Sequence, residues 1–256
     1  VFGSVLQVLL GKFLGDYATL LTYVVMFIPP MLYAASASGK NSFMNDGIKL
    51  NSANFGRLGG LLCALLAILA AVSANFISDA VSRVLPPMPE RLRYMLESMV
   101  KGNFLSNFLC VCICAPFFEE WLCRGMVLRG LLGRGVKPTL AIVVSACFFA
   151  LIHFNPWQAI PAFIFGCVMG FVYYRTGSLL LTMLIHFVNN FSSLAVVRLF
   201  PGIESIESWA DIMSPEAYSV TIALSVLVLI GCIAAFCRIE LKQPSGNLDL
   251  LPCIYQ

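Results

Sequence analysis

The chain has 256 residues, of which 59% are hydrophobic and only 11% are charged. Soluble domains carry about 25% charged residues, so this composition excludes an ordinary soluble domain and predicts a polytopic, all-α membrane protein. The formal net charge of +3 suits a membrane protein with basic loops better than a nucleic-acid binder. We therefore expect a single transmembrane domain over residues 1–256, embedded in the lipid bilayer. We expect no nucleic-acid partner.

Seven apolar segments follow one another along the chain, and a membrane-crossing helix needs roughly 20 such residues. They are 17–38, with Pro29 and Pro30 inside it; 58–77; a third from 104 through an acidic pair to about 131; a fourth and a fifth within 138–174, separated at 153–157; 178–197; and 217–237. Residues 1–14 are also apolar and form either an interfacial helix or part of an eighth span. The sequence thus predicts seven or eight transmembrane helices around an intramembrane cavity.

The loops between these segments differ in charge. On one side of seven spans fall Lys40, Lys49, Arg57, Arg129, Arg134, Lys137, Arg175 and Arg238, and on the other fall Glu204, Glu207, Asp211 and Glu216. Cytoplasmic loops carry the excess of basic residues, which predicts a cytoplasmic C-terminus. Residues 92–100 place apolar side chains at helical spacing beside basic ones, and this pattern favours a helix lying in the interface.

Two adjacent carboxylates, Glu119 and Glu120, interrupt the third segment in the stretch FFEEWLCR. A charge in the middle of a span costs about 2.5–3.5 kcal/mol, so these residues need a compensating partner or a function. Glu120 and Arg124 are four residues apart and can pair on one helix face. Glu119 lies about 100° around the helix, free to face a cavity and to act as a general base. The alternative is that the segment ends near Phe118 and the acids lie among lipid headgroups.

The only two histidines of the chain, His153 and His186, both fall in apolar segments. Asn190 follows His186 by four residues, so the two side chains share a helix face. Hydrogen-bond donors directed at one point stabilise a developing oxyanion, and Asn189, on a different face, is the weaker candidate. The ten cysteines contain no CxxC pair, so we interpret those in the apolar runs as packing residues.

Three short motifs occur in order on successive predicted helices: EEWLCR at 119–124, FALIH at 149–153 and HFVNN at 186–190. They match the patterns EExxxR, FxxxH and HxxxN. In these motifs, residues 104–198 resemble the CPBP family, the CAAX-protease and bacteriocin-processing (Abi) intramembrane proteases. The resemblance implies an integral-membrane endopeptidase.

The resemblance also implies roles for individual residues. Glu119 would activate a water molecule together with His153, and His186 with Asn190 would form the oxyanion hole. The supporting residues would be Glu120, Arg124 and Phe149, the last packing one turn before His153. A metal-free glutamate mechanism is favoured because HExxH is absent, and the alternative is a zinc site made of Glu119, His153 and His186.

The substrate class stays open between a prenylated CaaX tail, a peptide pheromone or bacteriocin leader, and another membrane protein. The compact chain resembles a bacterial member more than a eukaryotic one, which predicts the bacterial cell membrane and a membrane-embedded or membrane-associated peptide as partner. Two other hypotheses remain. One is a transporter that uses the acids and histidines as a proton relay, and the other is a non-catalytic immunity protein with the same fold.

Overall fold

The structure is a computed structural model that describes residues 10–40, 51–94, 102–199 and 208–241. All regular secondary structure in these ranges is helical, with no strand among the described residues, so the predicted all-α class is confirmed there. Most of the predicted helix at 1–14 and of the interfacial helix at 92–100 falls outside the described residues. Of these two stretches only residues 10–14 and 92–94 are described, and both parts are helical.

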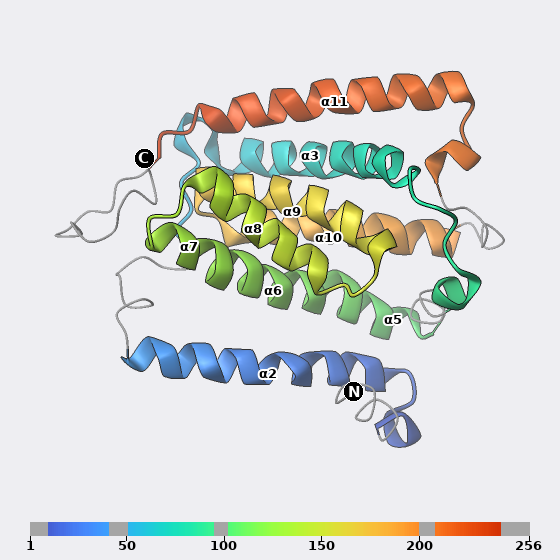
Figure 1. The fold of residues 1–256 in the computed structure, drawn as a ribbon, viewed down its shortest axis with the longest axis horizontal. Helices are drawn as coiled ribbons and strands as arrows, with labels where there is room; N and C mark the ends of the chain where they lie inside the picture. The colour runs from blue at the N-terminus through green and yellow to red at the C-terminus, as the bar shows by residue number, and fades with distance from the viewer. Residues whose placement is uncertain (1–9, 41–50, 95–101, 200–207, 242–256) are drawn as a thin grey trace.

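Each of the seven predicted apolar segments is a helix or a series of joined helices (Figure 1). The helices outside the third segment are α2 (Tyr17–Lys40), α3 (Gly59–Ser82), α8 (Pro138–Leu151), α9 (Pro156–Thr176), α10 (Leu179–Leu199) and α11 (Pro215–Cys237). A single turn of 3-10 helix, η1 (Gly56–Leu58), leads into α3, and another, η4 (Trp209–Asp211), precedes α11.

The third segment is a single long rod of 30 residues, Phe104–Gly133. Its parts in chain order are α5 (Phe104–Asn107), the π-helical η2 (Phe108–Cys114), α6 (Ala115–Glu120), the π-helical η3 (Trp121–Leu128) and α7 (Arg129–Gly133). The prediction that this helix continues to about residue 131 is confirmed, and the alternative end near Phe118 is wrong. The acidic pair therefore lies at the middle of the rod, between two π-helical stretches of a kind frequent at functional sites.

The local sequence explains where several of the helices begin and end. α8, α9 and α11 each carry proline in the first turn, where its missing N–H is not needed. The Asn155 side chain accepts from Gln158 N at the start of α9, and Ser214 accepts from Ala217 N at the start of α11. α9 ends at Gly177, whose φ of 63° is the left-handed conformation that glycine adopts without strain.

Five helices are long and apolar enough to cross a membrane by length and composition: Gly56–Ser82, Phe104–Gly133, Pro156–Thr176, Leu179–Val196 and Pro215–Cys237. The apolar helices Tyr17–Tyr33 and Pro138–Leu151 are shorter. The 14 residues of α8 rise about 21 Å, less than the roughly 30 Å of the hydrocarbon core. The protein is thus an integral membrane protein, and the count of seven or eight spans stays a prediction.

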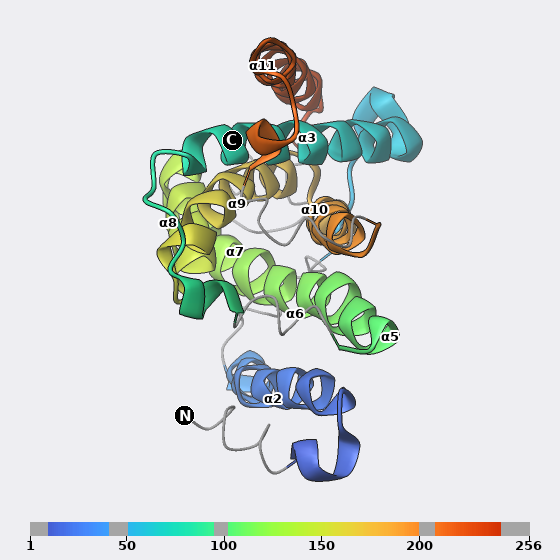
Figure 2. The same cartoon turned by 90° about the vertical axis from the view of Figure 1, so that its right-hand side faces the viewer.

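The helices lie in layers, with α3 and α11 on one side, α9 and α10 in the middle, and the 104–133 rod beyond them (Figure 1). Figure 2 shows that α3 crosses α11 obliquely. α2 packs against the rod on its far side. α8 and α9 approach closely at Gly166, where a Cβ would lie 2.8 Å from the Cβ of Ala146. A small residue at position 166 is what permits the two helices to come this close.

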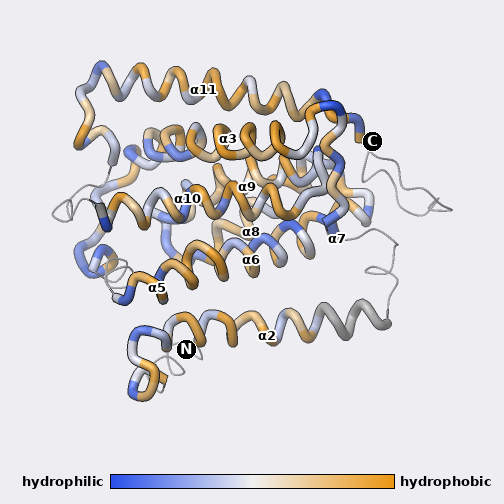
Figure 3. The backbone as a smooth tube through the Cα atoms, turned by 180° about the vertical axis from the view of Figure 1, so that it is seen from behind, coloured by the Kyte–Doolittle hydropathy of each residue, from blue (hydrophilic) through white to orange (hydrophobic). Residues whose placement is uncertain are grey.

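The two ends of the bundle are polar and its middle is apolar (Figure 3). Arg175 donates to the carbonyl oxygens of Phe236, Cys237 and Ile239, which joins the end of α9 to the end of α11. The C-terminal ends of α2, α7, α9 and α11 lie together at this end of the bundle (Figure 1). The loops predicted to carry the basic residues follow these ends, so they are on one side, as predicted. Its assignment to the cytoplasm stays a prediction.

Candidate active site

A buried ion pair occupies the rod at its midpoint. Arg124 Nη1 lies 2.8 Å from Glu120 Oε1, and both side chains are fully buried. Arg124 Nη2 also donates to the Gly166 carbonyl at 3.0 Å, and its guanidinium stands 4.7 Å from the centre of the Phe149 ring. The predicted pairing of Glu120 with Arg124 is therefore present, and it is tied to α8 and α9 as well.

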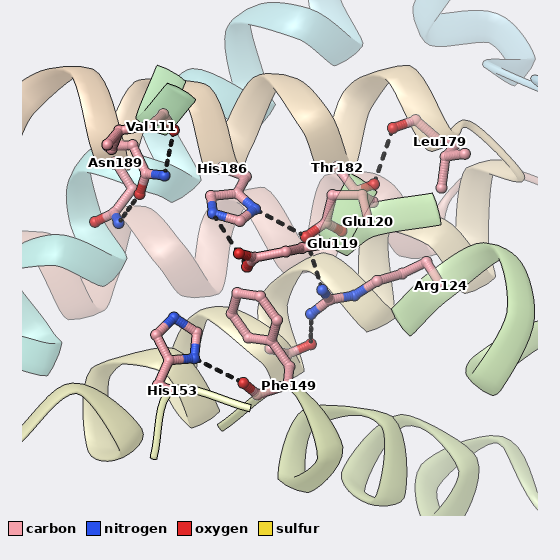
Figure 4. A network of polar contacts seen from close by, with 12 residues as sticks. Val111, Glu119, Glu120, Arg124, Phe149, His153, Leu179, Thr182, His186 and Asn189 are labelled. Atoms are coloured by element: carbon pink, nitrogen blue, oxygen red, sulfur yellow. Dashed lines mark hydrogen bonds and ion pairs between the residues drawn. The ribbon is translucent and has the colours of Figure 1, made fainter. Parts of the chain in front are cut away.

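His186 on α10 joins this pair to the second carboxylate (Figure 4). Its Nδ1 lies 3.1 Å from Glu120 Oε1, and its Nε2 lies 4.0 Å from Glu119 Oε2. Because an ionised carboxylate only accepts hydrogen bonds, Nδ1 carries the hydrogen that is donated to Glu120. The other nitrogen, Nε2, is thereby directed at Glu119.

Glu119 contacts α2 as well as His186. Its Oε1 accepts a hydrogen bond of 2.5 Å from the Tyr23 hydroxyl. Its Oε2 is buried and has no hydrogen-bond partner in the described part of the chain. The 4.0 Å between Oε2 and His186 Nε2 is too long for a direct hydrogen bond, and such a separation is one that a single bridging molecule can span.

His153 lies elsewhere than its motif suggested. α8 ends at Leu151, so His153 falls in the following turn rather than within a helix. Its Nδ1 is 2.8 Å from the Phe149 carbonyl oxygen. The Phe149 ring stands edge-on to both imidazoles, 5.1 Å from His153 and 5.4 Å from His186, and separates the two histidines in Figure 4. The expected packing of Phe149 against His153 is present, but no hydrogen bond or ion pair among the described residues joins His153 to Glu119.

Asn190 contacts the rod through its side-chain amide. Its Nδ2 donates to the Val111 carbonyl at 2.8 Å, and its Oδ1 accepts from Asn189 Nδ2 at 3.1 Å. Val111 lies in π-helical η2, where Ala115 N donates to Cys110 O, five residues earlier. In the same register Val111 O would need the N–H of residue 116, and Pro116 has none. Asn190 therefore supplies one of its two N–H groups to a carbonyl that residue 116 cannot serve.

Sequence reasoning missed two further contributors to this region. Tyr23 reaches Glu119 from α2, and Asn75 on α3 donates to Asn189 Oδ1 at 3.2 Å. Neither residue has a spacing or a motif that would have distinguished it from other polar residues in an apolar run. Only the packing of distant helices brings them to the site.

The zinc alternative can be tested against the donor atoms. No group of three or more His, Cys, Asp or Glu side chains that could hold a metal ion occurs within the described ranges. Of the three proposed ligands, Glu119 and His186 lie together, whereas His153 hydrogen-bonds to a backbone carbonyl beyond the Phe149 ring. These residues as placed do not fit a zinc site.

Residues 101–192 match the family model described as type II CAAX prenyl endopeptidase Rce1-like. The family resemblance predicted from the three motifs is confirmed. The match covers just over a third of the chain and contains the acidic pair, both histidines and Asn190. The Rce1-like family is one of membrane-embedded CAAX proteases, which are hydrolases that act on membrane-associated peptides. No curated protein and no solved structure matches the chain.

Proposed function

We propose that the protein is an intramembrane endopeptidase in which Glu119 is the general base. The observation that carries this proposal is the pair formed by the unpartnered Glu119 Oε2 and His186 Nε2, 4.0 Å apart. A water molecule held between these two atoms would be near a base and a histidine at once. The buried Glu120–Arg124 pair beside it holds His186 in this orientation through Nδ1.

The proposed reaction has three steps. Glu119 takes a proton from the water, and the oxygen attacks the peptide carbonyl to form a tetrahedral intermediate. His186, as the imidazolium, donates Nε2–H to the oxyanion, and Asn190 donates the amide hydrogen that Val111 does not use. The intermediate collapses when Glu119 returns its proton to the leaving amine nitrogen.

His153 keeps a secondary place in this proposal. To act on the same water as Glu119, its imidazole would have to leave the Phe149 carbonyl and pass the Phe149 ring. We therefore expect Glu119→Ala to lower cleavage by a larger factor than His153→Ala. Equal losses would instead support direct activation of the water by both residues.

The activity can be tested with two probes in proteoliposomes, a fluorogenic peptide that ends in a farnesylated CaaX sequence and a labelled apolar peptide of about 20 residues, the length of one span. Wild type is expected to cleave at least one, and Glu119→Gln to lose about 10²–10⁴-fold in kcat. Glu216→Gln, a change of an exposed acid at the start of α11, is the matched control. Cleavage by Glu119→Gln at the wild-type rate contradicts the proposal.

The metal-free mechanism is part of the proposal and has its own test. Activity should persist in 1,10-phenanthroline, and zinc added afterwards should not increase it. Loss of activity that zinc restores would favour the zinc-dependent alternative.

The transporter and the immunity-protein hypotheses predict no cleavage of either probe by wild type. A transporter would in addition show ion-dependent flux in the same vesicles, which separates these two alternatives. A bacterial origin and a cytoplasmic C-terminus stay part of the proposal, and labelling of a cysteine added after residue 241 from either side of the membrane tests the orientation.

A further inference from the structure

Glu119 has a polar contact with a residue outside 101–192, the segment that matches the family model. The Tyr23 hydroxyl on α2 donates to Glu119 Oε1 at 2.5 Å across 96 residues of sequence. A hydroxyl that donates to a carboxylate at this length is a charge-assisted hydrogen bond, about twice as strong as a neutral one. We propose that Tyr23 is a positioning residue that holds Glu119 in its reactive orientation, an inference that rests on the proposed function.

The phenol ring is itself held in place by aromatic neighbours. Its centre lies 5.2 Å from the ring of Phe27 and 6.5 Å from that of Phe118, and Phe27 stacks on Phe118 at 4.9 Å. Phe118 directly precedes Glu119 in the rod. The three rings therefore join α2 to the turn that carries the base, and they fix the point from which the hydroxyl donates.

The two carboxylate oxygens of Glu119 have different neighbours. Oε1 is bound by Tyr23, so the carboxylate cannot rotate without breaking that hydrogen bond, and Oε2 is kept facing His186 Nε2. No other hydrogen bond to Glu119 is seen within the described residues. Loss of the hydroxyl would leave the carboxylate free to turn away from His186.

α2 has a second attachment that does not involve the site. The Asp16 carboxylate accepts from Asn103 N at 2.9 Å, and Ser106 Oγ donates to the Asp16 carbonyl at 2.9 Å. With the aromatic stacking, this attachment should keep α2 in place when only the Tyr23 hydroxyl is removed. Tyr23→Phe therefore isolates the hydrogen bond from the docking of the helix.

The kinetic test compares Tyr23→Phe with Tyr33→Phe, a matched change at a tyrosine on the same helix that is 77% exposed. With whichever of the two probes wild type cleaves, Tyr23→Phe should lower kcat about 10- to 100-fold, the size of effect expected from misplacing a reacting group by about 1 Å. KM should stay within about twofold, because the hydroxyl does not bind the peptide. Tyr33→Phe should match wild type.

Two kinetic results would overturn the inference. One is a Tyr23→Phe enzyme with the same kcat as Tyr33→Phe, and the other is one that cleaves faster, which would show that the hydroxyl obstructs the site instead of ordering it. Neither result bears on whether the protein is a protease, because wild type cleaves in both.

A second arm does not depend on cleavage. Thermal unfolding of Tyr23→Phe, Glu119→Leu and the double variant should give a non-additive shift in Tm, because both single changes break the same hydrogen bond. Additive shifts would show that Tyr23 does not hold Glu119. If wild type cleaves neither probe, the proposed function fails, and this cycle still decides whether the contact exists.

Discussion

Glu119 and Glu120 are neighbours in the sequence and differ in nearly every other respect. Glu120 is fully buried, and its Oε1 is bound by Arg124 and by His186. Glu119 is 14% exposed, and its contacts are a neutral hydroxyl and, at 4.0 Å, the far nitrogen of the same histidine. The helix face therefore decides which of the two carboxylates is paired with Arg124.

The second oxygen of each carboxylate lacks a hydrogen-bond partner within the described residues, so the count of hydrogen bonds alone does not separate them. The two carboxylates differ in whether a cation is bound to them and in which helices their neighbours belong to. The Glu120 side is tied to α9 through Arg124 and Gly166 and belongs to the packed interior. The Glu119 side faces α2, which is attached through Asp16, the residue before its first turn, and through one aromatic cluster.

The largest effect on stability is expected at the Glu120 side. Glu120→Gln leaves Arg124 buried without its counter-ion, and breaking a buried pair in this way costs about 3–5 kcal/mol. We expect a strong loss of folded protein and of Tm in detergent, measured against Glu119→Gln, which should unfold near the wild-type temperature. A stably folded but wholly inactive Glu120→Gln variant would mean that the roles of the two glutamates are exchanged.

The double variant Glu120→Leu with Arg124→Met sharpens this comparison. Replacing both charges by apolar side chains of similar size is often neutral or stabilising, so the double variant should recover much of the Tm lost in Glu120→Gln. It should still cleave poorly, because His186 Nδ1 loses its acceptor. A double variant less stable than Glu120→Gln would show that the pair stabilises the bundle beyond neutralising its own charges.

Part of this contrast follows from the sequence and part does not. The contact of Glu120 with Arg124 and the different direction of Glu119 are set by helix geometry over four residues, so spacing alone predicts them. The place of His153 depends on where α8 ends, and the contact of Tyr23 with Glu119 depends on how α2 docks. Both are outcomes of packing between distant segments, which residue spacing does not encode.

The next largest loss of stability is expected at Gly166 on α9, whose carbonyl oxygen accepts a hydrogen bond from Arg124. A Cβ at residue 166 would lie 2.8 Å from Ala146 Cβ, so Gly166→Ala must push α8 and α9 apart and displace the carbonyl that Arg124 binds. Overpacking of this kind costs about 1–3 kcal/mol, to be read from Tm. Gly231→Ala on α11, where a Cβ meets nothing within 4 Å, is the matched control and should not destabilise the protein. Equal Tm values for the two variants would contradict the close approach of α8 and α9.

An effect of similar size separates two roles of Asn190. Asn190→Ala leaves the Val111 carbonyl without its donor, at a cost of about 1–3 kcal/mol. Adding Pro116→Ala supplies an N–H in the register that Ala115 N already uses toward Cys110 O. The Tm of the double variant should therefore fall by less than the sum of the changes in the two single variants. The single variant Pro116→Ala is the control, because it measures how far alanine alters the stability of the helix by its propensity alone.

Cleavage by the same double variant then tests the chemistry. If Asn190 also donates to the oxyanion, stability should be restored while kcat stays low, because a backbone N–H bound to Val111 cannot replace a donor at the substrate. Recovery of both stability and kcat would assign Asn190 to the support of the π-helical segment alone, and His186 would then be the remaining proposed oxyanion donor. Failure to recover stability would mean that the orphaned Val111 carbonyl is not what Asn190 serves.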